Sequence, residues 1–258
     1  MKPKALVLQA HGTNRDNDVA EALTLAGAEA VFVPLNELRS NKGSLSDFQM
    51  LVLPGGFSYA DSLGAGKLLA LDLNAYFVDE ISAFVGSGKP VIGICNGFQA
   101  LVKSGILPAT CENEEATLTF NAEGRFECRW ITLKPVSQNC IWTKGLSDEL
   151  IECPVAHGEG NFQTSSGFPL ITFIENEQIA LIYTDADGSP ANGIYPANPN
   201  GSVLDIAGIC NPRGNVLGLM PHPENHIHPH QHPQWTRGVD KNDGLPLFIN
   251  GVKYASEC

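Results

Sequence analysis

The stretch Pro90–Leu101 constrains this chain most strongly, because it predicts a buried strand, a sharp turn and a helix in immediate succession. Cys95 falls on the turn, between Gly93 and Gly97. Small neighbours permit the strained strand-to-helix turn called a nucleophile elbow, which holds a nucleophile clear of the backbone. The positive end of the following helix favours the thiolate, which is the reactive species. The pattern therefore predicts a cysteine nucleophile, and the alternative is an ordinary buried core cysteine.

A cysteine nucleophile needs a base, which is usually remote in the sequence but adjacent in the fold. His222 follows the apolar run Val216–Met220, which predicts a buried strand, and Glu224 comes two residues later. A carboxylate in that place can hold one ring nitrogen while the other faces the sulfur, as the acid of a catalytic triad does. We predict a triad of Cys95, His222 and Glu224, although a single histidine is more often structural.

A third segment, Leu51–Tyr59, passes from apolar residues into Gly55 and Gly56. Backbone at paired glycines can approach a substrate closely and present N–H groups to a developing oxyanion. An ordinary Pro-Gly-Gly turn would produce the same pattern. By itself this segment is therefore weak evidence, and it supports a catalytic site only together with the Cys95 and His222 segments.

In this order, the three segments resemble the class I, triad-type glutamine amidotransferases, and the resemblance covers residues 1 to about 224. Shorter strings are similar to the glutaminase subunits of phosphoribosylformylglycinamidine synthase, an enzyme of purine biosynthesis. These strings are Gly12–Asn14, Gly55–Tyr59, Ala156–Asn161, Asn198–Ser202, Ile206–Ile209 and Gly214–Val216.

The resemblance implies that Cys95 attacks the side-chain amide of glutamine, giving a glutamyl thioester and ammonia. His222 would transfer the protons, Glu224 would orient it, and water would release glutamate. In the same way the resemblance implies an oxyanion and substrate-binding set of Gly55, Gly56, Asn96, Gln99, His157, Gly158 and Glu159.

A partner is also implied by the resemblance. Ammonia would pass to a separate synthetase subunit, which uses ATP and Mg²⁺ to convert formylglycinamide ribonucleotide to the amidine; whether a small third subunit is needed stays open. This chain is expected to hold no cofactor and no metal. Gly64–Lys67 superficially suggests a phosphate loop, but it lacks the first glycine, and Leu68 replaces the required Ser or Thr.

Two other functions stay open. Another Cys-His-Glu class I amidotransferase or a γ-glutamyl hydrolase would share the triad, although the runs 56–59 and 157–161 argue against it. A catalytically silent regulatory module is disfavoured because the triad is intact. The chain departs from the family pattern at Ala60, where glycine is expected, and at Arg15, where cysteine is frequent.

Composition and alternation predict the fold. The 258 residues are 43% hydrophobic and suffice for one sizeable core, so we expect a single amidotransferase domain over 1–258. Alternating strands and helices predict an α/β, flavodoxin-like fold with a mostly parallel central sheet flanked by helices, and with added strands over Ala116–Thr184. The expected strands are Lys4–Gln9, Ala30–Leu35 and Met50–Leu53, and the expected helices are Asn17–Ala26, Ala65–Leu73 and Ala75–Gly86.

Charge and cysteine usage limit the partners and the compartment. The net charge of −12 disfavours a nucleic-acid partner. The apolar stretch at the N-terminus is too short for a signal peptide or a membrane span, so no membrane contact is expected. Seven cysteines are an odd number without the density of a disulfide scaffold, which predicts a cytoplasmic location.

A His/Pro-rich loop and tail occupy residues 225–258. His226, His228, His230 and His232 alternate, so an extended chain would place all four on one side, as a metal site requires. No cysteine or aspartate accompanies them, which favours a solvated loop held extended by its prolines. Asp243–Asn250 predicts a final packed segment.

Overall fold

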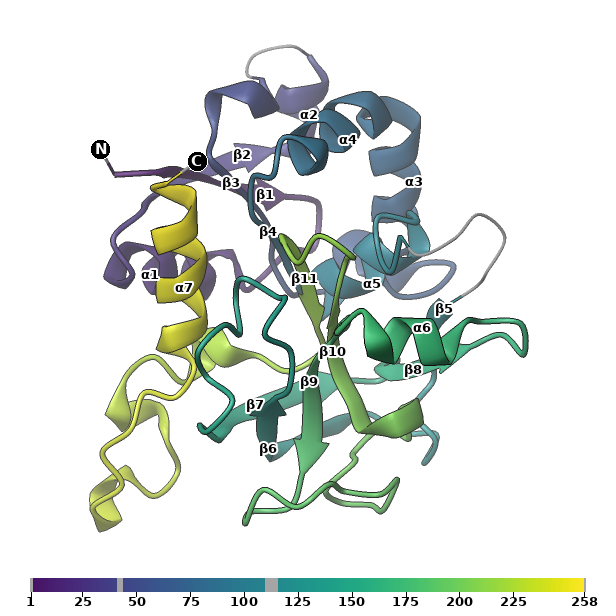
Figure 1. Ribbon diagram of the computed structural model, residues 1–258. Coiled ribbons are helices and arrows are strands. Elements are labelled where there is room, and N and C mark those ends of the chain that lie inside the picture. Colours follow the sequence, from purple (N-terminus) through teal and green to yellow (C-terminus); the bar gives the residue numbers. More distant parts are fainter. Residues whose placement is uncertain (1, 41–43, 110–115, 258) are drawn as a thin grey trace.

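The computed structural model describes residues 2–40, 44–109 and 116–257. Within these ranges the strands form a nine-stranded sheet in the order β2-β1-β3-β4-β11-β10-β9-β6-β7 and a separate pair, β5-β8 (Figure 1). The bounds are β1 Lys4–Gln9, β2 Glu29–Pro34, β3 Met50–Leu53, β4 Val91–Ile94, β5 Ala116–Thr119, β6 Glu127–Pro135, β7 Ile151–His157, β8 Asn161–Thr164, β9 Ile179–Thr184, β10 Ile206–Cys210 and β11 Val216–Leu219.

The sheet is parallel from β2 to β11 and antiparallel from β11 to β7. Strands β3, β4 and β11 are buried along their whole length, as expected where helices cover both faces of a parallel sheet. The predicted α/β class is confirmed. The extra strands of the middle third both extend this sheet, through β6, β7 and β9, and flank it, through β5 and β8.

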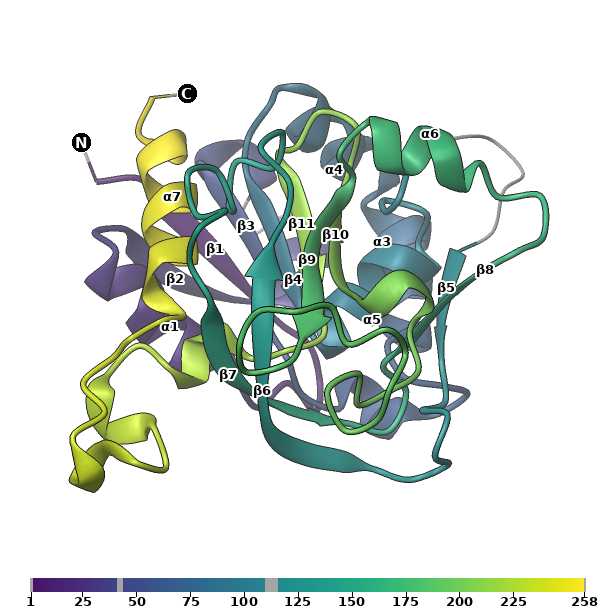
Figure 2. The same cartoon turned by 60° about the horizontal axis from the view of Figure 1, so that its bottom comes forward.

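Helices lie on both faces of the parallel part. α1 packs on β1 and β2 together with α7, while α5 packs on β3, β4 and β11 together with α3, on the opposite face (Figure 2). The helix bounds are α1 Asp16–Leu25, α2 Leu35–Arg39, α3 Lys67–Tyr76, α4 Val78–Gly86, α5 Asn96–Lys103, α6 Leu170–Glu175 and α7 Leu245–Ala255.

The predicted elements of the first half lie close to their expected positions. β1 and β3 match to the residue, and β2 begins and ends one residue early. The helix expected from Ala65 begins at Lys67, because Gly66 caps it in the left-handed conformation, with φ 70°. Among the described residues, no helix combines the length and the apolar character that crossing a membrane requires.

The His-rich loop differs from the prediction. A short 3₁₀ turn over Pro229–Gln231 breaks the extended path, so the four imidazoles do not share a side. His226 and His232 are 0% and 6% exposed, whereas the rings of His228 and His230 stack on each other at 5.1 Å. The prediction of a solvated, extended loop was therefore wrong for two of the four histidines. Within the described ranges, no group of three or more His, Cys, Asp or Glu residues is placed to hold a metal ion.

Candidate active site

Cys95 occupies the turn between β4 and α5. Its backbone lies at φ 50°, ψ −105°, outside the regions that non-glycine residues normally adopt. The turn also needs its glycines, because a Cβ on Gly97 would lie 2.0 Å from the carbonyl oxygen of Leu53, and one on Gly93 would lie 2.8 Å from that of Gly97. The sequence-predicted elbow is thus present, and it places the sulfur at the carboxyl end of the parallel strands.

His222 and Glu224 lie beside this turn. β11 pairs with β4 in parallel, with Leu219 opposite Ile94, so the residues after both strands emerge together. Nδ1 of His222 lies 2.7 Å from a carboxylate oxygen of Glu224, and both side chains are buried. Nε2 of His222 has no hydrogen-bond partner among the described residues. It is therefore available to a reacting group.

The electrostatics of this pair favour a charged imidazole. Burial by itself would lower the pKa of His222, but the negative charge of Glu224, followed by that of Cys95, outweighs it and raises the pKa from 6.5 to about 10. A protonated His222 beside Cys95 is suited to stabilise a thiolate and later to donate a proton.

Gly55 lies against the imidazole of His222, and Gly56 lies against the Gly12–Asn14 backbone. A Cβ built on Gly55 would be 2.8 Å from Cε1 of His222, so the loop can approach the ring only with glycine here. Gly56 pairs with Thr13 in an isolated antiparallel bridge, in which Asn14 N–H donates to Gly55 and Phe57 N–H donates to Gly12. In such a pair the N–H of Gly56 points away from Thr13. It is therefore left for another acceptor.

A buried amide network joins α5 to the loops around it. Asn96 accepts the backbone N–H of Ser58 at 3.1 Å and donates to Gln99 at 3.1 Å. Gln99 in turn donates to the carbonyl of Glu159 at 2.7 Å. The carboxylate of Glu159 accepts the N–H of Ala65 at 3.2 Å, in the segment Gly64–Lys67. Three segments that are far apart in the sequence are thereby held in one geometry.

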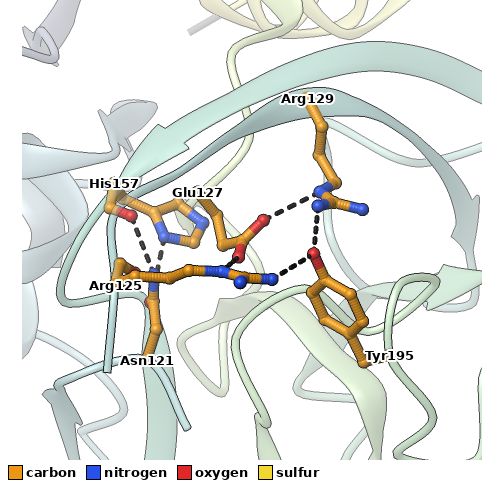
Figure 3. Close-up of polar contacts among 6 residues, drawn as sticks. All are labelled: Asn121, Arg125, Glu127, Arg129, His157 and Tyr195. Carbon is orange, nitrogen blue, oxygen red and sulfur yellow. Dashed lines mark hydrogen bonds and ion pairs between the residues drawn. The ribbon is translucent and has the colours of Figure 1, made fainter. Parts of the chain in front are cut away.

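His157 is brought into the same region but is held neutral. Its Nδ1 lies 3.1 Å from Oδ1 of Asn121, and Nδ2 of the same asparagine donates to the His157 carbonyl at 2.8 Å (Figure 3). Burial, reinforced by the charge of His222, lowers the pKa of His157 to about 3. Gly158 follows it, and the Gly158 carbonyl accepts the N–H of Asn121 at 2.9 Å.

A family model described as the CobB/CobQ-like glutamine amidotransferase domain matches residues 2–255. The chain belongs to this glutamine amidotransferase family.

Named relatives agree over almost the whole length. The chain is 60% identical over 242 residues to the phosphoribosylformylglycinamidine synthase subunit PurQ of Treponema denticola, covering 88% of this chain and 89% of that protein. It is 44% identical to the protein of that name from Dehalococcoides mccartyi, covering 99% of each. Among solved structures, it is similar to one described as PurLQS from Thermotoga maritima, with a TM-score of 0.76, 31% identity and coverage of 98% and 99%.

Sequence reasoning missed several residues that shape the site of this amidotransferase. Asn121 fixes His157 through its side chain, and Asp61 accepts the Asn96 amide at 2.9 Å. The carbonyl of Ala156 lies 3.7 Å from the Cys95 sulfur. A lone Asn or Asp in a loop, or a backbone carbonyl, carries no sequence pattern that would single it out.

The two departures from the family pattern lie on loops beside the site. Ala60 has φ 54°, a conformation that glycine adopts without strain, which agrees with the expectation of glycine at this position. Arg15 places its Cγ 3.5 Å from where a Cβ on Gly55 would lie, and its guanidinium pairs with Asp18 at 3.0 Å. Neither residue is hydrogen-bonded to Cys95, His222 or Glu224.

Proposed function

We propose that this chain is the glutaminase subunit of a phosphoribosylformylglycinamidine synthase, which hydrolyses glutamine through a cysteine thioester. The observation that carries the proposal is a cysteine on a strained elbow beside a buried His222–Glu224 pair. The near full-length similarity to the PurQ relatives supports the choice of this amidotransferase among the class I enzymes.

The chemistry runs in two halves. The sulfur of Cys95 attacks the amide carbon of glutamine, and the C–N bond breaks as His222 gives its proton to the leaving ammonia. Water then attacks the thioester, His222 takes a proton from it, and the C–S bond breaks to release glutamate. Glutamine and water are consumed, and glutamate and ammonia are formed.

Backbone donors would stabilise both tetrahedral intermediates. The N–H of Gly56 points away from its bridge partner, and that of Asn96 begins α5 next to the sulfur. Preorganised donors of this kind are each worth about 2.7 to 4 kcal/mol in the transition state. The substrate glutamine would bind along Gln99 and the Gly158–Glu159 backbone, and Gly55 and His157 would complete the proposed substrate-binding set.

The ammonia needs an acceptor, which we assign to a synthetase subunit. The similar structure from Thermotoga maritima is described as PurLQS, which supports an assembly with a synthetase and a small third subunit. ATP and Mg²⁺ would be used on the synthetase. The free thiols of all five cysteines that the structure describes support a cytoplasmic location.

The isolated chain should be a poor glutaminase that its synthetase activates by about tenfold or more, because a small misplacement of the reacting groups is costly. Tyr59, Ala60 and Asp61 follow the proposed oxyanion glycines after two intervening residues, and all three have left-handed backbones. This loop therefore has strain that a partner could stabilise or relieve. Glutamine hydrolysis should be compared with and without the synthetase. Full turnover by the chain alone, unchanged by partner and nucleotide, would instead favour an independent γ-glutamyl hydrolase.

Chelation should leave glutamine hydrolysis intact, because no step of the thiol mechanism needs a Lewis acid. The measurement is turnover of the complex with ammonia release as the readout, before and after treatment of this chain with a strong chelator. The chelator must be removed before Mg²⁺ is supplied to the synthetase. Loss of activity that zinc or nickel restores would contradict the expectation.

A further inference from the structure

β7 is the edge strand of the large sheet. Its outer edge faces Cys95 and the segment from His222 to His226 instead of pairing with another strand. β6 pairs with its other side. Backbone groups alternate along a strand, so the carbonyls of Glu152, Pro154 and Ala156 share the side away from β6. Pro154 fits such a position, because its missing N–H removes no bond to a neighbouring strand.

Each of these three carbonyls contacts a different part of the site. The Ala156 carbonyl lies 3.7 Å from the Cys95 sulfur. The Pro154 carbonyl accepts the backbone N–H of His222 at 2.9 Å. The Glu152 carbonyl lies 2.5 Å from Nδ1 of His226, which acts as the donor because the oxygen can only accept. One row of acceptors therefore aligns the nucleophile, the base and a histidine of the tail.

His226 is bound on several sides at once. Its side chain is fully buried, and its ring meets the Trp130 ring edge-on at 5.1 Å between centroids. Its backbone N–H donates to Pro223 at 3.0 Å, and its carbonyl accepts from Gly244 at 2.9 Å. The segment His222–His226 is thus attached to β7 at both ends, and Glu224 lies in the middle of it.

Residues of the tail also contact Glu152, whose carbonyl accepts the hydrogen bond from His226. His232 lies 2.9 Å and Lys241 lies 3.6 Å from the Glu152 carboxylate. The backbone N–H of Glu152 donates to Asp243 at 3.3 Å. The acceptor that His226 uses is therefore fixed by residues from the same tail.

We propose that His226 is a positioning residue for the triad, whose imidazole holds the His222–Glu224 segment in register with Cys95 through the Glu152 carbonyl. The inference rests on the proposed function, since it takes His222 as the base and Glu224 as its orienting acid. His226 itself touches neither glutamine nor the reacting sulfur in this mechanism.

The test compares His226→Ala with His226→Asn, and uses His230→Ala as the matched control at an exposed histidine of the same loop. Glutamine hydrolysis is measured in the complex with the synthetase, and the rate of Cys95 alkylation by iodoacetamide is followed by mass mapping. His226→Ala should lower kcat by about ten- to a hundredfold while KM changes little, because only the geometry of the reacting groups is disturbed. His226→Asn should recover most of the loss, because the asparagine amide can donate to the same carbonyl.

Two outcomes decide against the proposal. Wild-type kcat in His226→Ala, or an equal loss in His226→Ala and His226→Asn, overturns it, since the second result indicates packing alone. Thermal unfolding shows whether the alanine variant is folded. If it is not, a well-folded His226→Leu replaces it in the comparison with His226→Asn. The His226 variants do not test the proposed triad itself. Its failure would be recognised separately, by retained activity in His222→Ala.

Discussion

Replacement of Cys95 by serine should lower glutamine hydrolysis by about 10⁶-fold, the scale on which removal of a triad nucleophile acts. Among the cysteines that the structure describes, Cys95 is the one on a strand-to-helix elbow with a buried histidine beside it. Ammonia-dependent synthesis by the complex should be unaffected, because the acceptor reaction belongs to the synthetase. The measurement is the ratio of glutamine-dependent to ammonia-dependent product formation.

Covalent labelling checks the same assignment independently. A diazo-ketone analogue of glutamine should modify Cys95 alone, and Cys128→Ser is the matched control because Cys128 is exposed. Label found on Cys128 or Cys210 while Cys95 stays free would refute the assignment. The same holds for Cys111, which lies outside the residues that the structure describes.

Replacement of His222 by alanine should lower glutamine hydrolysis by about 10²- to 10⁴-fold, the usual contribution of general acid–base catalysis. Glu224→Gln should cost less, because it leaves the imidazole in place. Without the Glu224 charge, however, burial would act to lower the pKa of His222 from its value of about 10. The variant should therefore lose proportionally more activity as pH rises through neutrality, since less of its imidazole is protonated.

The pH profile of kcat in the complex is the measurement for this pair. Wild type and Glu224→Gln should diverge toward higher pH, and His230→Ala serves as a control at an exposed histidine. A rate in His222→Ala equal to that of the wild type would contradict the assignment. Parallel profiles for wild type and Glu224→Gln would show that the carboxylate does not set the charge of His222.

Local sequence patterns were sufficient to predict the parts of the site that depend on them. The elbow around Cys95 is predictable because only small residues fit where α5 packs on β3 and β4, and this requirement appears directly as glycine at positions 93 and 97. His222 and Glu224 are predictable because they directly follow a buried strand. The parallel pairing of β4 with β11 was not visible, yet it is what brings the two segments together.

The tail shows why the rest could not be predicted. Alternating histidines indicate one face only if the chain is extended, and the turn at Pro229–Gln231 breaks that path. After the turn, His232 packs on Trp130 and contacts Glu152, which are remote in sequence. His226 and His232 became buried, whereas His228 reaches Glu21 on α1 at 2.8 Å. Such long-range contacts leave no periodicity in the sequence.

The outer side of β7 has a consequence for solubility. A strand at the end of a sheet is a template on which another chain can add by backbone pairing, and proteins protect such strands with prolines, charges or covering segments. Here Pro154 and the segment from His222 to His226, which holds the proposed base and its acid, cover it. Damage that releases this segment would therefore uncover an aggregation-prone edge, so selection for a soluble protein and selection for an active one act on the same few residues.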